Sequence, residues 1–186
     1  TAVSSDGRFV IFDKISRANQ QDILVLDLEN QSVDVVAGSP FWEGNGALSP
    51  DDGWLAYESD ETGRKEVYLR PLASDTGRVQ VSDGGGELPA WSKQGDRIFF
   101  RQDDRIMIVD VDLTGSDAVL SRQETFVAGV AAGRSTTAAA DVFDVSQDGS
   151  RLLMSLRDPD VDSGAHLGVV FGFLGELRQM ARDAER

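Results

Sequence analysis

The stretch "SPDDGWLAYESD", residues 49–60, joins a polar turn to an apolar strand, "WLAY". Three other segments carry the same pattern: "SSDGRFVIF" (4–12), "SKQGDRIFF" (92–100) and "SQDGSRLLM" (146–154). The four segments begin 45, 43 and 54 residues apart. The longest interval contains the low-complexity stretch "AAGRSTTAAAD" (131–141), which indicates an inserted loop. The chain is therefore built from repeats of about 43 residues.

Each repeat has room for four short antiparallel strands. An inner strand is predicted before the second, third and fourth turns, at 46–49, 88–92 and 141–146. A second strand follows each turn segment, at 21–29, 65–72, 104–113 and 166–173. The first three repeats have a further short strand, at 32–38, 78–83 and 118–127. A four-stranded unit that repeats every 40 to 45 residues is typical of a β-propeller blade. We expect an all-β propeller over residues 1–173, with blades at about 1–40, 44–83, 87–128 and 139–173. A short C-terminal helix is predicted over 174–186, where Leu174, Leu177 and Ala181 have helical spacing.

The segments "LSPDDGWLAYESDETGRKEVYLRPL" and "GGGELPAWSKQGDRIFFR" resemble the PD40, or WD40-like, repeats of TolB and tricorn-type propellers. The ending "DVSQDGSRLLMSLRD…HLGVVFGFLGELRQM" resembles the last blade and closing helix of propellers attached to bacterial Ser/Thr protein kinases. The resemblance implies a binding or sensing scaffold and slightly favours a periplasmic or otherwise extracytoplasmic location.

Two of the turns depart from the repeat. In the second, Asp52 stands where the other segments have glycine, and Gly53 comes one place late. Asp tolerates left-handed backbone better than most residues, so we expect the turn to survive. In the third, Lys93 and Gln94 replace the usual Pro-Asp, and this turn is predicted to lack its carboxylate.

A complete propeller usually has four to eight blades, and this chain supplies a little under four. Three explanations remain open: the chain is the C-terminal part of a larger propeller, it pairs with a second copy to complete the ring as a homodimer, or it closes alone as a four-blade ring. Because Thr1 is not an initiator and "TAVSSDGRFV" does not resemble a secretion leader, we expect an excised or processed piece.

The composition limits the partners. Eighteen basic and 32 acidic residues give a net charge of −14, which disfavours nucleic-acid binding because the phosphate backbone is repelled. No apolar run approaches the ~20 residues that a membrane-spanning helix needs, so no membrane insertion is expected. There is no cysteine, which excludes disulfides, thiolate nucleophiles and cysteine zinc sites.

The sequence predicts no catalytic group and no cofactor. Its one histidine, His166, precedes an apolar strand and is best explained as structural. Neither a Gly-x-Ser-x-Gly elbow nor a P-loop occurs, and Gly84-Gly85-Gly86 joins two strands rather than opening a helix. The pairs Asp51/Asp52 and Asp103/Asp104 lie at predicted turns, where Asp is expected for local hydrogen bonding.

No metal site is predicted, and the acidic loop "RDPDVDSGAH" (157–166) is only a weak candidate for one. Asp158, Asp160 and Asp162 have the spacing that opens a calcium-binding EF-hand loop. The later positions of that loop fail, because Ser163 stands where glycine is needed and Val169 where a bidentate Glu is needed.

The strongest candidate binding surface is "GSPFWEGNG" (38–46), which connects the first predicted blade to the second. Phe41 and Trp42 are large apolar groups in a Gly/Ser/Pro/Asn-rich connection, and exposed aromatic residues of this kind often anchor a partner. The alternative is that both pack between blades. The candidate site residues are Phe41, Trp42, Glu43 and Asn45, with Glu87 and Arg134 in equivalent connections.

Three functions follow as hypotheses, of which the last is a self-assembling structural module. The first is a non-catalytic scaffold whose rim binds a protein partner or a small ligand. The second is a substrate-recruiting or sensor domain of a peptidase or Ser/Thr kinase whose catalytic domain lies outside these residues.

Overall fold

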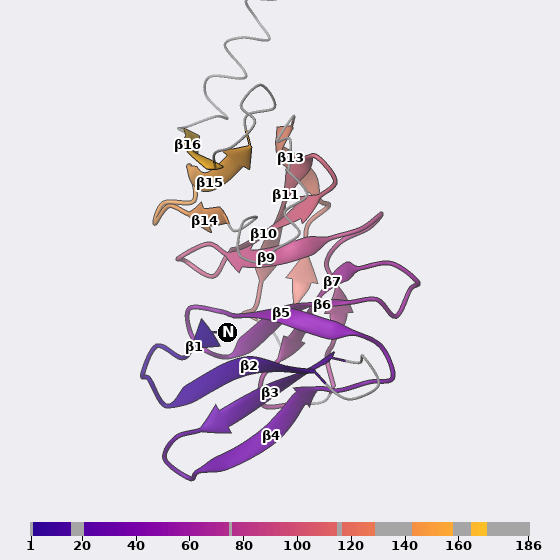
Figure 1. The fold of residues 1–186 in the computed structure, drawn as a ribbon, viewed down its shortest axis with the longest axis vertical. Coiled ribbons are helices and arrows are strands. Elements are labelled where there is room, and N and C mark those ends of the chain that lie inside the picture. The colour runs from indigo at the N-terminus through magenta and orange to yellow at the C-terminus, as the bar shows by residue number, and fades with distance from the viewer. Residues whose placement is uncertain are drawn as a thin grey trace, which may run out of the picture.

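The computed structural model describes residues 2–15, 21–74, 76–114, 117–128, 143–157 and 165–170, and folds them into four antiparallel sheets (Figure 1). The first sheet contains β1 (Ala2–Val3), β2 (Phe9–Ile15), β3 (Gln21–Asp27) and β4 (Ser32–Ala37). The second contains β5 (Glu43–Leu48), β6 (Trp54–Ser59), β7 (Glu66–Pro71) and β8 (Val79–Gln80). The third contains β9 (Glu87–Trp91), β10 (Arg97–Gln102), β11 (Arg105–Asp112), β12 (Val119–Leu120) and β13 (Glu124–Ala128), and the fourth β14 (Phe143–Val145), β15 (Leu152–Arg157) and β16 (Ala165–Val170).

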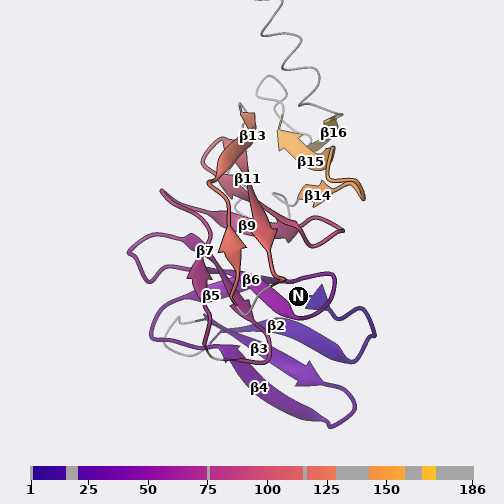
Figure 2. The ribbon, with the colours of Figure 1, turned by 180° about the vertical axis from the view of Figure 1, so that it is seen from behind.

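The strands of each sheet pair in chain order, and both β12 and β13 pair with β11. The four sheets follow one another in a stack, with β1–β4 at one end and β14–β16 at the other (Figures 1 and 2). The described residues are therefore all β, as predicted. They contain no helix long and apolar enough to cross a membrane. The predicted helix over 174–186 lies outside the described residues.

Sheet faces pack on each other through three apolar clusters, one between each pair of successive sheets. The alternation of side chains along a strand explains how one strand serves two neighbours. In β10, Ile98 and Phe100 face the second sheet, while Phe99 between them faces the fourth and meets Phe126 edge-on at 5.2 Å. Because both faces are covered, these strands are apolar without interruption, which is why "RIFF" and "WLAY" lack the polar alternation of a surface strand.

The repeated segments form one turn design. In each, the fourth residue of the segment donates its N–H to the carbonyl of the leading serine, at 2.9–3.1 Å. The serine hydroxyl accepts the N–H of the residue five places on, and in the first, second and fourth turns it donates to an aspartate two places on. That hydroxyl stabilises the charged carboxylate and so lowers the pKa of Asp6, Asp51 and Asp148.

The structure accommodates each departure from the repeat in its own way. Asp52 has φ 59°, close to the 74°, 75° and 68° of the glycines at the same place in the other turns, which confirms that the turn survives the substitution. The prediction that the third turn lacks a carboxylate is wrong. Ser92 donates at 2.7 Å to Asp96, which lies four residues on instead of two and supplies the missing oxygen.

Neighbouring turns also contact each other along one side of the stack. Ser5 in the first turn donates both its N–H (2.8 Å) and its hydroxyl (2.6 Å) to the Asp52 carboxylate in the second. The side-chain amide of Gln94 in the third turn donates at 2.6 Å to the carbonyl of Gln147 in the fourth. The repeated turns thus link the first sheet to the second and the third sheet to the fourth, and their carboxylates are structural.

A candidate binding face between the second and third sheets

The residues predicted to form a site lie in different surroundings. Phe41 is exposed, whereas Trp42 is half-buried and Glu43 is buried. Glu43, Asn45 and Glu87 belong to the inner strands β5 and β9 rather than to the connections before them. Arg134 and the acidic residues Asp158, Asp160 and Asp162 lie outside the described residues. Within the described part of the chain, no group of three or more acidic or histidine side chains is placed to hold a metal ion.

Trp42 packs against the hairpin that joins β6 to β7 in its own sheet. Its N–H donates to the Asp60 carboxylate at 2.8 Å, and its carbonyl accepts the Asp60 N–H at 3.2 Å. The ammonium group of Lys65 lies 3.9 Å from the centre of the Trp42 ring, a cation–π contact. A Cβ on Gly44 would lie 2.9 Å from the same ring, so only glycine fits there. The two aromatic residues therefore differ in their surroundings. Phe41 is exposed, whereas the Trp42 ring contacts the Lys65 ammonium.

Glu58 lies beneath that lysine and links two sheets. Its side chain is fully buried, and one carboxylate oxygen accepts the Asn45 side-chain amide and the Leu88 N–H, each at 2.7 Å. The other oxygen lies 3.0 Å from the Lys65 ammonium; this is a Coulombic contact without the alignment of a hydrogen bond. Since Asn45 is in β5 and Leu88 in β9, one carboxylate joins the inner strands of the second and third sheets.

This link repeats a contact between the first and second sheets. Asp13, nine residues after Ser4 as Glu58 is after Ser49, accepts the Asn45 N–H at 3.3 Å. Asn45 and Leu88 occupy equivalent places in irregular segments of their strands and share left-handed backbone, with φ of 53° and 54°. At the corresponding place in the third repeat the chain has Arg101, so the charge is reversed.

Arg101 instead forms an ion pair with Glu87, its cross-strand neighbour in β9. The connection that leads into β9 is fixed by a second buried carboxylate. Glu66 accepts the Gly85 N–H at 2.9 Å and the Ser82 hydroxyl, and its side chain is fully buried. Gly86 donates to the Lys65 carbonyl at 2.9 Å. The amides of Gly85 and Gly86 are thus occupied within the protein, which argues against a phosphate cradle.

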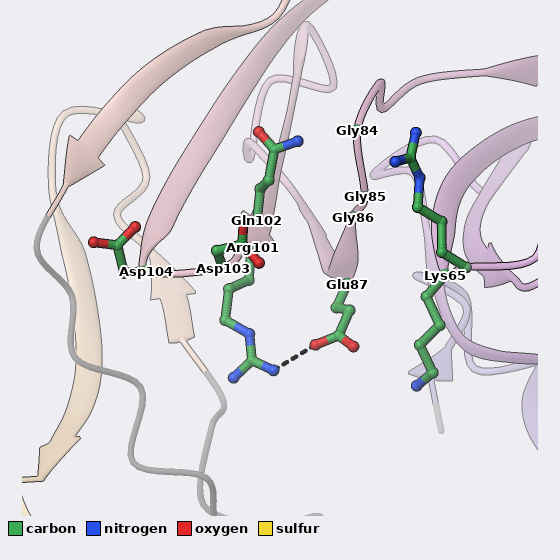
Figure 3. A pocket seen from close by; sticks show the side chains of 10 residues that line it. Lys65, Gly84, Gly85, Gly86, Glu87, Arg101, Gln102, Asp103 and Asp104 are labelled. Atoms are coloured by element: carbon green, nitrogen blue, oxygen red, sulfur yellow. Dashed lines mark hydrogen bonds and ion pairs between the residues drawn. The ribbon is translucent and has the colours of Figure 1, made fainter.

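A pocket of about 520 Å³ lies between these elements (Figure 3). It lies at the strand ends opposite the repeated turns, because β10 begins directly after its turn and ends at Gln102, which lines the pocket. Lys65 and the glycine connection form one side, the Glu87–Arg101 pair lies centrally, and the Asp103–Asp104 hairpin forms the other side (Figure 3). The residues that line it are Arg64, Lys65, Gly84, Gly85, Gly86, Glu87, Arg101, Gln102, Asp103 and Asp104. None of these described lining residues is Ser, Thr, Cys or His, so they offer charge and hydrogen bonds but no pair of nucleophile and base.

A second hollow, of about 580 Å³, lies at the turn end of the same two sheets, beside Asp51, Asp96 and Asp112. The first two carboxylates are held by the turn serines, and Asp112 accepts the N–H and hydroxyl of Thr114 at 2.9 and 2.7 Å. Because these acidic groups already stabilise turns, the pocket around Glu87 and Arg101 is the better candidate for ligand binding.

Sequence reasoning found Glu87 but missed Lys65, Arg101 and Glu58. The signal was present in the repeat alignment, where Asp13, Glu58 and Arg101 stand at one position nine residues after the turn serine. A charged residue inside an otherwise apolar strand is unusual and needs a partner. In the third repeat the residue at this position has the opposite charge. Its side chain, Arg101, pairs with Glu87 and lines the pocket.

No family model and no curated protein sequence matches the chain. Among solved structures, it is similar to TolB from Acinetobacter baumannii, with a TM-score of 0.65 and 16% identity over 91% of this chain and 39% of that one. It is also similar to a puromycin-hydrolyzing peptidase from Mycobacterium tuberculosis, with a TM-score of 0.57 and 14% identity over 94% of this chain and 27% of that one. The acylaminoacyl peptidase from Pyrococcus horikoshii is similar with a TM-score of 0.51 and 11% identity over 92% of this chain and 32% of that one.

The chain thus spans about two-fifths or less of the length of these proteins. At such identities the likeness establishes the fold alone. Together with the four repeated antiparallel sheets, it confirms the architecture that the repeats and their resemblance predict. The chain has a TolB/PD40-like β-propeller fold.

Proposed function

We propose that the chain is a non-catalytic binding scaffold, and that the pocket between the second and third sheets binds a short charged segment of a protein partner. The observation that supports this most is the pocket itself, which has basic groups on one side, acidic groups on the other and no nucleophile among its described lining residues. Its volume of about 520 Å³ lies in the usual range for ligand sites.

The walls of the pocket are fixed before a ligand arrives. Glu66 and the carbonyl of Lys65 hold the glycine connection, and Glu58 holds both Lys65 and the start of β9. A preorganised site loses less conformational entropy on binding. An extended peptide with both basic and acidic side chains complements this arrangement, with its acidic groups toward Lys65 and its basic groups toward Asp103 and Asp104.

The test uses a displayed library of random twelve-residue peptides, selected on the purified chain. Affinities of the enriched peptides are then measured by fluorescence anisotropy for the wild type, for Asp104→Lys at the pocket and for Glu29→Lys as a control. Both aspartate and glutamate are well exposed, so neither charge reversal should disturb folding. We expect Asp104→Lys to weaken binding at least tenfold and Glu29→Lys to leave it unchanged. Equal affinities in the two variants, or no enrichment, would exclude the pocket as the site.

A second candidate is a substrate-recruiting domain of a peptidase, and the likeness of the fold to two peptidases supports it. In this case the catalytic groups belong to residues outside this chain. The reading frame on either side of the segment that encodes these 186 residues distinguishes the candidates. A Gly-x-Ser-x-Gly elbow there favours the peptidase, a kinase catalytic loop favours the sensor of a Ser/Thr kinase, and neither motif favours the independent scaffold.

A further inference from the structure

The ammonium group of Lys65 is held between an aromatic ring and a buried carboxylate. It lies 3.9 Å from the centre of the Trp42 ring and 3.0 Å from an oxygen of Glu58, whose side chain is fully buried. A lysine has a long flexible stem, and a free lysine loses rotamer freedom when a ligand binds to it. The two contacts already order this group, so a ligand of Lys65 does not bear that entropic cost.

Trp42 has a fixed place although it is not among the residues that line the pocket. Its backbone N–H and carbonyl both bond to Asp60, at 2.8 and 3.2 Å. Its ring lies against Gly44, where a Cβ would be 2.9 Å from the ring. A residue outside the pocket thus sets the position of a cation inside it.

The Lys65 ammonium keeps hydrogen-bonding capacity for a ligand. In the described part of the chain, its contact with Glu58 lacks the alignment of a hydrogen bond. The charge of Glu58 is also shared with the Asn45 amide and the Leu88 N–H, which donate to its other oxygen. Because the Lys65 side chain is 38% exposed and lines the pocket, its N–H groups can donate to an acceptor there.

The surroundings of Lys65 favour an acceptor with a single negative charge. Glu87 lies centrally in the pocket, with Asp103 and Asp104 on its other side, and these carboxylates repel a doubly charged phosphate more than a carboxylate (Figure 3). The amides of Gly85 and Gly86, which a phosphate would need, are occupied within the protein. A carboxylate forms a charge-assisted hydrogen bond with an ammonium group at lower electrostatic cost.

We infer that Lys65 is the subsite of the pocket for one carboxylate of the bound segment, and that Trp42 is the residue that positions it. The carboxylate belongs to an acidic side chain of the segment or to its C-terminus. This inference rests on the proposed function, because it requires a segment bound in the pocket. It adds the chemical group that the segment must carry and a positioning residue that the pocket lining does not include.

The peptides enriched on the purified chain identify the carboxylate. Each acidic residue is replaced by its amide, and each peptide is made with a free and with an amidated C-terminus, which separates the two sources. We expect one of these changes to weaken binding to the wild type about tenfold and to have no effect on binding to Lys65→Met, which has lost the ammonium. Lys93→Met is the matched control, since Lys93 is exposed at the third turn, and it should respond like the wild type.

Trp42→Leu and Trp42→Phe test the positioning role. Leucine removes the ring, whereas phenylalanine keeps a weaker π face. We expect Trp42→Leu to weaken the carboxylate peptide about two- to fivefold and Trp42→Phe to weaken it less, while the affinity of the amide peptide is unchanged in both variants. A purely structural role of Trp42 would instead weaken both peptides equally.

The outcomes separate this inference from the proposed function. Peptides that are sensitive to Asp104→Lys, but whose carboxylates show no coupling to Lys65 or no selective response to Trp42→Leu, overturn the inference and leave the binding pocket standing. Stronger competition by inorganic phosphate than by acetate also contradicts a carboxylate subsite. An absence of enriched peptides, or equal affinities for Asp104→Lys and Glu29→Lys, overturns both.

Discussion

The removal of the Glu58 carboxylate should destabilise the contact between the second and third sheets. Glu58 is fully buried, and one of its oxygens accepts both the Leu88 N–H and the Asn45 side-chain amide at 2.7 Å. Glu58→Ala leaves both donors without this acceptor and leaves the Lys65 ammonium without its buried counter-charge. An unsatisfied buried donor costs about 1–3 kcal/mol, so two partly buried donors should lower the free energy of unfolding by about 3 kcal/mol.

Glu58→Gln separates the hydrogen bonds from the charge. The amide oxygen of glutamine can still accept both donors, but the attraction to Lys65 is lost because an amide NH2 group then faces the ammonium. Since Lys65 is partly exposed, we expect that loss to be about 1 kcal/mol. In a chain of this length 1 kcal/mol corresponds to about 2–4 °C in Tm, so Glu58→Ala should lower Tm by about 6–12 °C and Glu58→Gln by about 2–4 °C.

Urea unfolding followed by the fluorescence of the three tryptophans measures both variants. The exposed Glu29→Ala variant is the control for the loss of a glutamate and should fall within about 0.5 kcal/mol of the wild type. If Glu58→Ala and Glu58→Gln differ by less than about 0.5 kcal/mol, the hydrogen bonds to the inner strands do not hold the two sheets together and the reasoning fails.

Three further outcomes follow from local geometry. Asp52→Asn should leave Tm nearly unchanged because Asn tolerates φ 59°, whereas Asp52→Ala should lower the free energy of unfolding by about 1–2 kcal/mol through left-handed strain and the lost bonds from the first turn. Gly86→Ala would place its Cβ 2.6 Å from a buried serine hydroxyl and should cost about 1–3 kcal/mol in chemical denaturation, while Gly53→Ala, with its closest contact at 3.5 Å, should be tolerated. Trp42→Ala should lower Tm because it removes the ring that supports a lysine, and the exposed Phe41→Ala should not; equal losses in Tm would place both residues in the core.

The local parts of this fold were predictable because their interactions lie within a few residues. The serine of each turn bonds to groups two to five positions away, so its signature is contiguous in the sequence. The same locality explains the confirmed backbone of Asp52, where the position in the repeat dictates a left-handed conformation. It also explains the wrong prediction for the third turn, because Asp96 reaches the same serine from a different offset.

The sequence by itself determined four repeated units, their turns and their apolar strands, because hydrogen bonding within a turn and side-chain alternation along a strand depend on neighbouring residues. Only the tertiary structure decided that Trp42 supports Lys65, that Glu58 bonds to Leu88 thirty residues away, and that Arg101 faces a pocket. Such contacts join residues that are far apart in the sequence, and their geometry is fixed by how strands pair and how whole sheets stack. No local pattern of residues specifies which polar groups that stacking brings together.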